Sequence, residues 1–556
     1  MEAKICTIST FFLAGFIILS HASEPEVSLK IGKLKGVVSR SYAGREFNAY
    51  LGIPFAKPPI GSLRFQDPVP PEPWSGTLDA SKPGNMCLQM QDEGNEDCLY
   101  LNIYTPKIDS TNGKGLDVLV AIHGGGFQNG FSHMQEPDYL MDRDDLILVT
   151  FNYRLGILGF LSLGDEYLPG NYGLKDQVLA LRWIKENIGS FGGDANKITL
   201  LGCSAGGASV HYHVLSPLSK GLFQKAIMMS GTALDPWAKK VDPKSATLEV
   251  AEAIGCPVDG CHSKIVECLK EQPADLLTKK ASIFVKYLIF DGMHIGPVVE
   301  KAGNSKEPFI LTEPEELIKA GKISNVPLLI SHTDTDGMFL AAEVLKKDEY
   351  IDELETRWYE LAPIVFDFES GDEQKDRKTA QSIREFYFGQ RSIRENPLNL
   401  VKLFTERYLS LGAQKAAKLH ALVSKSPVYA YIFSHVGKPR LTDLLNVTFT
   451  FQGGADHADD FMYVLPMPTI RKQIENPSEL AMSLRMIETV MKFIKGTPVK
   501  GWRTVQSGLP NLTYLKISGP DEVDEFQTLT DFSSHKFWES LKIGGSSAKK
   551  AARTEL

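Results

Sequence analysis

The fold of this chain can be read from Ile198-Thr-Leu-Leu-Gly-Cys-Ser-Ala-Gly-Gly-Ala-Ser-Val210. The apolar start predicts a buried strand, the small residues predict a tight turn, and the apolar end predicts a helix. The pattern Gly202-x-Ser204-x-Gly206 is typical of an elbow that presents a serine to a base, because its glycines let strand and helix pass closely. Ser204 is therefore the candidate nucleophile. The backbone N–H of Ala205, at the helix N-terminus, is a candidate donor to a developing oxyanion.

Strands and helices alternate on both sides of this elbow. The run Asp117-Val-Leu-Val-Ala-Ile122 is apolar throughout, as in a strand buried on both faces of a parallel sheet. The glycine-punctuated segment 27–54 predicts a small antiparallel meander. The alternation predicts an α/β fold with a large, mostly parallel sheet flanked by helices. We expect strands at 99–104, 118–123, 146–153, 326–330 and 428–433, a helix over 173–188 and a turn at 191–194.

Three consecutive glycines follow the strand at 118–123, in His123-Gly124-Gly125-Gly126-Phe127. Consecutive glycines are costly to order, which indicates a function for them. We expect the N–H groups of Gly125 and Gly126 to complete an oxyanion hole with Ala205. The alternative is a flexible connection, but linkers seldom begin with His and end with Phe.

An elbow serine predicts its partners in the chain order serine, acid, histidine, each on a loop after a later strand. The loop after the strand at 326–330 offers Asp334 and Asp336. We favour Asp336 because the following glycine lets the chain turn and expose the carboxylate. Small residues leave His457 unshielded on a later loop. The hypothesis is that Ser204 attacks an acyl carbonyl, His457 transfers the proton and Asp336 orients the imidazole.

Composition and the chain ends bear on location. A net charge of -8 and a pI near 5.9 argue against nucleic acid or an anionic membrane as partner. The apolar run 5–19, with Lys4 before it and Ser20-His-Ala22 after it, predicts a signal peptide, with a signal anchor as the alternative. We therefore expect a signal peptide at 1–22, one catalytic domain at 23–545 and a flexible tail at 546–556. No motif indicates a metal or a cofactor.

A secreted chain permits disulfides and glycosylation. Cys87 with Cys98 closes a short loop, whereas Cys256 has both Cys261 and Cys268 as alternative partners. Cys203 lies inside the elbow, so we expect it to be buried and unpaired. Two sequons, at Asn446 and Asn511, predict N-glycosylation.

The last four residues, Arg553-Thr-Glu-Leu556, resemble the Lys-Asp-Glu-Leu class of retention signals. They predict either retention in the endoplasmic reticulum, through a retention receptor, or secretion.

Taken together, the motifs resemble the type-B carboxylesterases, a family with the α/β-hydrolase fold that includes cholinesterases and juvenile hormone esterases. The resemblance implies a triad of Ser204, Asp336 and His457, with Gly125, Gly126 and Ala205 as oxyanion donors. It also implies the disulfides Cys87–Cys98 and Cys256–Cys268, and a supporting role for Ser230 behind the acid. The likeness covers 52–461 and rests, besides the elbow, on Tyr50-Leu-Gly-Ile-Pro54, Arg64-Phe65, Glu96-Asp-Cys-Leu-Tyr-Leu-Asn102, His123-Gly-Gly-Gly126, Asn152-Tyr-Arg154, Gly170-Asn-Tyr-Gly-Leu-Lys-Asp-Gln177 and Phe191-Gly-Gly-Asp194.

Three departures from the family bear on substrate. Cys203 stands where carboxylesterases have Glu and juvenile hormone esterases have Gln, and the acid is Asp336 rather than Glu. The loop between Cys87 and Cys98 has no Trp to hold choline by cation–π attraction. We therefore expect a serine carboxylesterase for uncharged esters rather than a cholinesterase. A juvenile hormone esterase or a lipase-like hydrolase is the alternative, and a non-catalytic adhesion protein is a remote one.

Overall fold

A computed structural model describes twelve segments of the chain. The predicted signal peptide, the C-terminal tail and the Asn446 sequon lie outside them. The described residues are 24–89, 93–107, 115–240, 242–290, 294–438, 440–445, 453–468, 470, 476–497, 502–508, 511–521 and 525–543.

An 11-stranded sheet forms the centre of the molecule, in the order β14-β13-β12-β11-β10-β9-β7-β8-β6-β4-β3. The strands from β8 to β13 run parallel, and the pairs toward both edges are antiparallel. The strands are β3 (Val37–Arg40), β4 (Glu46–Pro54), β6 (Tyr100–Pro106), β7 (Leu116–Ile122), β8 (Leu146–Phe151), β9 (Gly193–Cys203), β10 (Lys225–Met229), β11 (Leu328–Thr333), β12 (Val428–Phe433), β13 (Leu512–Ile517) and β14 (Glu525–Leu529).

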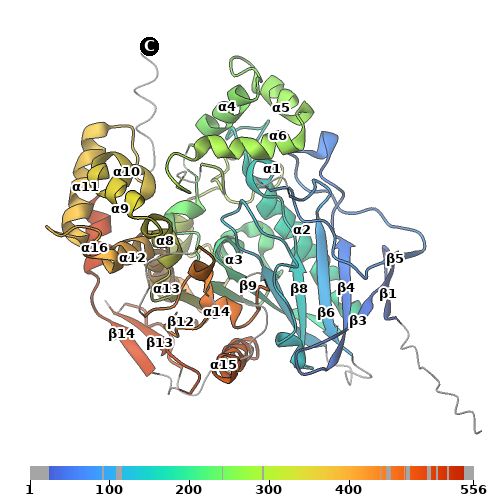
Figure 1. Ribbon diagram of the computed structural model, residues 1–556. Coiled ribbons are helices and arrows are strands. Elements are labelled where there is room, and N and C mark those ends of the chain that lie inside the picture. The colour runs from blue at the N-terminus through green and yellow to red at the C-terminus, as the bar shows by residue number, and fades with distance from the viewer. Residues whose placement is uncertain are drawn as a thin grey trace, which may run out of the picture.

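Helices cover both faces of this sheet, which explains the continuous apolar runs in its strands. In β7, Val118 and Val120 belong to the core on one face, and Leu119 belongs to the core on the other face with α15. Figure 1 shows α4–α6 at the top of the view and α9–α11 at its upper left. The helices are α1 (Gly156–Phe160), α2 (Tyr172–Asn187), α3 (Ala205–Leu215), α4 (Pro243–Ala253), α5 (His262–Glu271), α6 (Ala274–Lys279), α7 (Pro314–Lys319), α8 (Met338–Leu345), α9 (Asp348–Thr356), α10 (Trp358–Val365), α11 (Glu373–Tyr387), α12 (Pro397–Thr405), α13 (Leu411–Val423), α14 (Asp459–Met462), α15 (Pro477–Ile494) and α16 (Ser533–Ser540).

The α/β class is confirmed, but the N-terminal meander is split between two sheets. The strands β1 (Glu26–Leu29) and β2 (Gly32–Lys35) pair antiparallel, and β2 pairs in parallel with β5 (Thr77–Asp79). The following strands β3 and β4 join the large sheet instead. The chain crosses between the sheets at Gly36, where a Cβ would lie 2.5 Å from the Ala49 carbonyl oxygen.

Two predicted boundaries differ from the structure. The strand β9 begins at Gly193, inside the turn predicted at 191–194. The strand β11 continues to Thr333, three residues beyond the strand expected at 326–330. These three residues stay in the strand because they pair in register with Tyr431–Phe433 of β12. The loop carrying the candidate acid is therefore shorter than the sequence indicates.

Candidate active site

Ser204 occupies the turn between β9 and α3, as the elbow pattern predicts. Its backbone has φ 58° and ψ −126°, a strained conformation for a residue with a side chain. Ser204 is partly exposed, whereas Cys203 and Ala205 on either side are buried. The turn therefore brings the hydroxyl of Ser204 out of the core at the carboxyl end of β9.

Glycines allow three backbone segments to meet at this turn. A Cβ on Gly202 would lie 2.2 Å from the carbonyl oxygen of Gly206, and one on Gly206 would lie 2.0 Å from that of Ile122. A Cβ on Gly231 would lie 2.0 Å from the carbonyl oxygen of Ser204. These distances exclude any side chain, so the glycines fix how closely β7, β10 and α3 approach the elbow.

The triple-glycine loop lies directly against the elbow. A Cβ on Gly124 would lie 3.1 Å from the Cβ of Ser204. The next two residues, Gly125 and Gly126, have φ of +101° and +62°, in the region that favours glycine. Gly125 is exposed and Gly126 half-buried, while Ala205 is fully buried at the first position of α3. The backbone amides of both segments therefore border the same serine.

His123 holds this loop in place. Its ring stacks on Tyr153 with centroids 4.4 Å apart, and its Nδ1 donates to the carbonyl oxygen of Gly124 at 2.9 Å. The Tyr153 hydroxyl donates to the carbonyl oxygen of His123 at 3.1 Å. Burial lowers the pKa of His123 to about 4, so the ring is neutral at neutral pH. We interpret His123 as structural.

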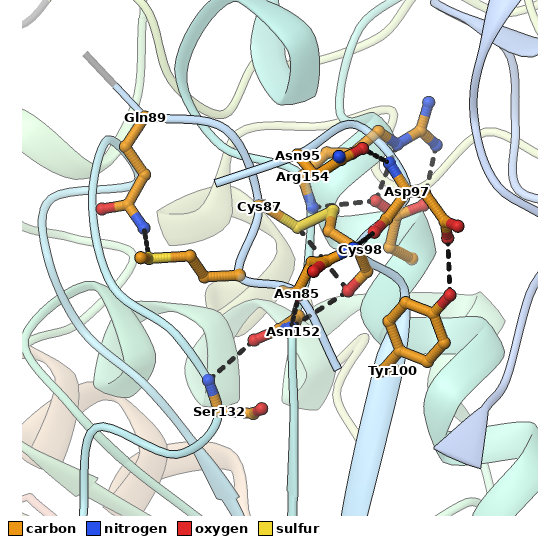
Figure 2. The surroundings of a disulfide bond; sticks show 12 residues. Asn85, Cys87, Gln89, Asn95, Asp97, Cys98, Tyr100, Ser132, Asn152 and Arg154 are labelled. Atoms are coloured by element: carbon orange, nitrogen blue, oxygen red, sulfur yellow. Dashed lines mark hydrogen bonds and ion pairs between the residues drawn. A yellow bond between two sulfur atoms is a disulfide. The ribbon is translucent and has the colours of Figure 1, made fainter. Parts of the chain in front are cut away.

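A second support runs from a disulfide to the segment after the loop. Asn152 donates to the carbonyl oxygens of Asn85, at 2.8 Å, and Cys98, at 3.0 Å. Its own Oδ1 accepts from the backbone N–H of Ser132 at 2.7 Å, and Figure 2 shows Asn152 between the disulfide and Ser132. One side chain, that of Asn152 directly after β8, thus ties the Cys87–Cys98 disulfide to the segment that follows the loop.

Asp336 and His457 form a direct pair. His457 Nδ1 donates to Asp336 Oδ1 at 2.6 Å, and the other carboxylate oxygen accepts from the backbone N–H of Thr333 at 3.0 Å. Asp336 is fully buried and His457 is 5% exposed. The alternative acid, Asp334, instead accepts from the backbone N–H of Ala455 at 2.7 Å. The geometry therefore favours Asp336 as the acid that orients His457. Asp334 instead holds the loop that carries His457.

Charges around His457 determine its protonation. Burial lowers its pKa, but the hydrogen bond and charge of Asp336, with the charges of Asp456 and Asp460, outweigh burial and raise the pKa above 6.5. Phe339 stacks on the imidazole with centroids 4.6 Å apart. With Nδ1 bonded to Asp336, the other ring nitrogen, Nε2, remains for proton transfer.

Ser204 follows β9, and Asp336, with His457 bonded to it, follows β11, which is separated from β9 by β10 in the same sheet. The charges of Asp336 and Asp460, after burial, raise the pKa of the thiol of Cys203, next to Ser204. Between the described residues no hydrogen bond joins the Ser204 hydroxyl to His457. In structures without substrate such a bond is often long and tightens only in the complex.

Comparison with known proteins identifies the family. The carboxylesterase family model matches residues 23–533. This chain belongs to the carboxylesterase family. A carboxylic ester hydrolase of Bombus ignitus is 36% identical over 96% of this chain and 98% of its own length. Esterase FE4 of Myzus persicae is 38% identical over 88% and 87%. The juvenile hormone esterase of Manduca sexta, solved with OTFP covalently attached, superposes with a TM-score of 0.80 at 30% identity and covers 93% of this chain and 99% of its own.

The protein is thus a carboxylic ester hydrolase with the α/β-hydrolase fold. Cys203, where the sequence departs from the family pattern, is a buried free thiol, as predicted. The predicted support of the acid by Ser230 is not seen. Its hydroxyl is fully buried and has no hydrogen-bond partner in the described part of the chain, so this role stays a prediction.

Among the described residues of this carboxylesterase, disulfides join Cys87 to Cys98 and Cys256 to Cys268, and Cys261 is an exposed free thiol. Asn511 is half-buried at the residue before β13. A search of the described residues finds neither a helix suited to crossing a bilayer nor a cluster of three metal-binding side chains.

Several residues of this site were not found from the sequence. Asp456 accepts from the backbone N–H of His457 at 2.8 Å, and Asp460 accepts from the hydroxyls of Tyr431, at 2.8 Å, and Ser331, at 3.0 Å. Burial, above all, raises the pKa of Asp460 to about 6. The acidic run around His457 was a visible signal for both carboxylates. The stacking of Phe339 on His457 had no sequence signal, because 118 positions separate the two rings.

Proposed function

We propose that this carboxylesterase hydrolyses uncharged carboxylic esters through an acyl-enzyme on Ser204. The observation that carries the proposal is the 2.6 Å bond between His457 and Asp336, at the edge of the sheet where Ser204 leaves the core. A buried imidazole oriented by a carboxylate is a suitable base for a serine hydroxyl. Of the twelve histidines in the sequence, His457 has this partner and the predicted chain order.

The reaction proceeds in two half-reactions. Ser204 Oγ attacks the carbonyl carbon while its proton passes to His457 Nε2, and the carbonyl oxygen becomes an oxyanion held by the N–H groups of Gly125, Gly126 and Ala205. Collapse breaks the bond to the alcohol oxygen, which takes the proton from His457 and leaves. Water then attacks the acyl-serine, gives its proton to His457, and releases the acid as Ser204 recovers its proton.

Asp336 contributes in two ways. Its hydrogen bond fixes the tautomer with the proton on Nδ1, so that Nε2 presents its lone pair. Its charge stabilises the imidazolium that forms in each half-reaction, which agrees with the raised pKa of His457.

The test is hydrolysis of 4-nitrophenyl esters by wild type and Ser204→Ala. We expect the variant to lose essentially all activity across acyl chain lengths, while Cys261→Ala, which removes an exposed thiol far along the chain, retains it. Unchanged hydrolysis by Ser204→Ala would reject the mechanism.

A juvenile hormone is the second candidate substrate, and the structural likeness to the Manduca sexta esterase favours it. The presence of Cys203 in place of Gln argues against it, because the thiol removes a hydrogen-bonding amide from beside the serine. Comparison of kcat/KM for a juvenile hormone and for 4-nitrophenyl butyrate shows which of the two esters the enzyme prefers. A strong preference for the hormone would identify it as the natural substrate.

The proposal on location rests on sequence signals near both termini. We propose that residues 1–22 direct the protein into the secretory pathway, that 23–545 form the catalytic domain, and that Arg553–Leu556 engage a retention receptor. N-glycosylation at Asn446 and Asn511 belongs to the same proposal. Imaging of tagged protein with and without the last four residues tests it, since unchanged secretion on deletion excludes retention.

A further inference from the structure

A chain of hydrogen bonds connects the C-terminal helix α16 to the acid loop. His535 on α16 bonds through Nε2 to Gln414 Oε1 at 2.9 Å, and Gln414 Nε2 lies 3.1 Å from His332 Nε2. His332 Nδ1 in turn lies 2.7 Å from the carbonyl oxygen of Thr333. The backbone N–H of Thr333 donates to Asp336 at 3.0 Å. Five consecutive bonds therefore join α16 to His457.

The chemistry of these groups fixes the direction of each bond. A carbonyl oxygen accepts only, so His332 must carry its proton on Nδ1 and present a lone pair at Nε2. The amide nitrogen of Gln414 must then face His332, and its oxygen must face His535. His535 therefore donates through Nε2. With His332, Gln414 and His535 neutral, each of these bonds has one donor and one acceptor.

The end of β10 explains why Thr333 needs these partners. Ser331 accepts from the backbone N–H of Ser230, just past the last residue of β10. Two residues further along β11, the N–H and C=O of Thr333 face the same side, where no strand continues β10. Asp336 satisfies the N–H group and His332 satisfies the C=O group. The carboxylate of Asp336 and the imidazole of His332 thus hold the two polar backbone groups of the same residue, which lie in the two peptide units that meet at its Cα.

We propose that His332, Gln414 and His535 are positioning residues for the hydrolysis, because they hold Thr333 and through it the carboxylate of Asp336. This inference rests on the proposed role of Asp336. His332 is 6% exposed, and Gln414 and His535 are half-buried, so these bonds are partly shielded from water. The C-terminal helix thereby belongs to the support of the active site.

Other contacts hold α16 on the domain independently of this chain. The Trp538 Nε1 donates to the hydroxyl of Tyr387 at 2.7 Å, and the Ser534 hydroxyl donates to Glu406 at 2.9 Å. Loss of the His535 bond therefore need not detach the helix. Substitutions at His535 and Gln414 therefore test the positioning of Asp336 without removing the contacts that attach α16 to the domain.

Charged groups on several elements change the pKa values of the two histidines in this hydrogen-bond chain. Asp336 and Asp334 on the acid loop raise the pKa of His332, but burial, the largest effect, lowers it overall. Burial, then Lys418 and Lys415 on α13 and His332 itself, lowers the pKa of His535 to about 4. Both histidines are therefore neutral where the enzyme is active, as the bond directions require.

The experiment measures kcat, KM and the pH dependence of kcat/KM for the full-length enzyme. Gln414→Met removes both bonds of the amide at nearly constant length, and His535→Leu removes the terminal donor. His535→Gln restores an N–H donor, and Gln381→Met, on an exposed glutamine of α11 that bonds Glu385, is the matched control. We expect Gln414→Met to lower kcat about tenfold at unchanged KM, the effect of a small misplacement of catalytic groups.

The same variants should also change the pH profile. A loosened Asp336 raises the pKa of His457 less, so the acid limb of kcat/KM should move to lower pH in Gln414→Met and His535→Leu. His535→Gln and Gln381→Met should match wild type. If Gln414→Met does not fold, comparison of kcat and of the acid limb between His535→Leu and His535→Gln tests the inference.

Two outcomes overturn the inference. One is a wild-type kcat and acid limb in the folded Gln414→Met and His535→Leu variants. The other is a loss of thermal stability alone, with both kinetic readouts unchanged, which would make the chain purely structural. Activity remaining in Ser204→Ala would instead overturn the proposed function, so the two failures are distinguishable.

Discussion

At the scale of single residues, the site depends on positions that exclude a side chain. The strained backbone of Ser204, with φ 58°, is held because glycines let neighbouring segments close around it. Gly206 is, with Gly231, the most constrained of them, since its missing Cβ would lie 2.0 Å from the carbonyl oxygen of Ile122. Ile122 directly precedes the loop with the oxyanion donors. A change at Gly206 therefore acts on both halves of the oxyanion hole.

Gly206→Ala should lower kcat/KM about a hundredfold or more, comparable to the loss of an oxyanion donor. The added methyl pushes Ile122 away and moves the loop that follows. Gly189→Ala is the matched control, because a Cβ there has open space. Steady-state kinetics with a 4-nitrophenyl ester measures the effect, and equal values for the two variants would show that the elbow tolerates the methyl.

Asp336→Asn should reduce kcat about ten-thousandfold, by analogy with the loss of the acid in other serine hydrolases. The pKa of His457 is raised above 6.5, so wild-type activity should increase with pH through a midpoint above 6.5. When the charge of Asp336 is removed, burial has the larger effect and lowers the pKa of His457. The residual activity should therefore have its pH midpoint at a lower pH than that of wild type. A pH series of kcat/KM measures both effects.

Asp334→Asn is the control for this assignment, because its carboxylate bonds Ala455 and not the imidazole. A larger loss in Asp334→Asn than in Asp336→Asn would reverse the choice of acid.

At the scale of elements, the strands with apolar runs were predictable and the polar ones were not. The apolar runs of β7, β8 and β12 predicted the bounds of these strands to within a few residues, because both faces of a parallel sheet are buried. The end of β11 was missed because Ser331-His-Thr333 pairs with β12 despite its polarity. Likewise the N-terminal strands were read correctly as strands, but the sheets they join depend on Gly36, whose contact with Ala49 no local pattern encodes.

A buried ion pair connects the segment that follows β8 to α2. Arg154 donates to Asp176 through Nε at 2.8 Å and Nη2 at 2.7 Å, with exposures of 4% and 0%. Arg154→Met leaves the buried carboxylate unpaired and should lower the free energy of unfolding by about 3–5 kcal/mol. Urea denaturation at pH 7 measures this loss.

Arg182→Met is the control on the same helix. Arg182 and its partner Glu307 are 38% and 59% exposed, and such pairs contribute about 0–1 kcal/mol. Equal stability losses in the two variants would contradict the view that burial determines the strength of the Arg154 pair.

At the scale of the whole molecule, the sequence located the candidate residues but not their relations. Chain order led to Ser204, Asp336 and His457 as candidates, since the carboxyl ends of parallel strands meet at one edge, and the bond between His457 and Asp336 agrees with that choice. The supports of these residues lie far away in sequence: Phe339 stacks on His457, and the bonds from α16 reach Asp336 through α13 and β11. Such contacts arise from packing, so a local pattern does not predict them.

Buried neutral histidines should make the fold sensitive to acid. His213 bonds Gln177 at 2.9 Å and Ser219 at 2.7 Å, and burial lowers its pKa from 6.5 to about 3. Because the folded pKa is depressed, the stability from this residue is complete above 6.5 and is lost as the pH falls from 6.5 toward 3. The loss is about 1.4 kcal/mol per pH unit.

His213→Gln removes this one titration while other groups stay constant. The variant should be less stable than wild type at pH 7.5, and the difference in free energy of unfolding should narrow at pH 5. Urea denaturation at both values measures it. A difference that is constant with pH would show that His213 titrates alike in the folded and unfolded states.

The central claim is that the hydroxyl of Ser204 is the nucleophile of this carboxylesterase. Its most direct test is mass spectrometry of the enzyme after reaction with a fluorophosphonate, with the modified peptide sequenced. The account predicts one adduct per molecule, on Ser204, with its formation greatly slowed in His457→Ala. An adduct on another residue, or unchanged labelling of Ser204→Ala, would contradict it.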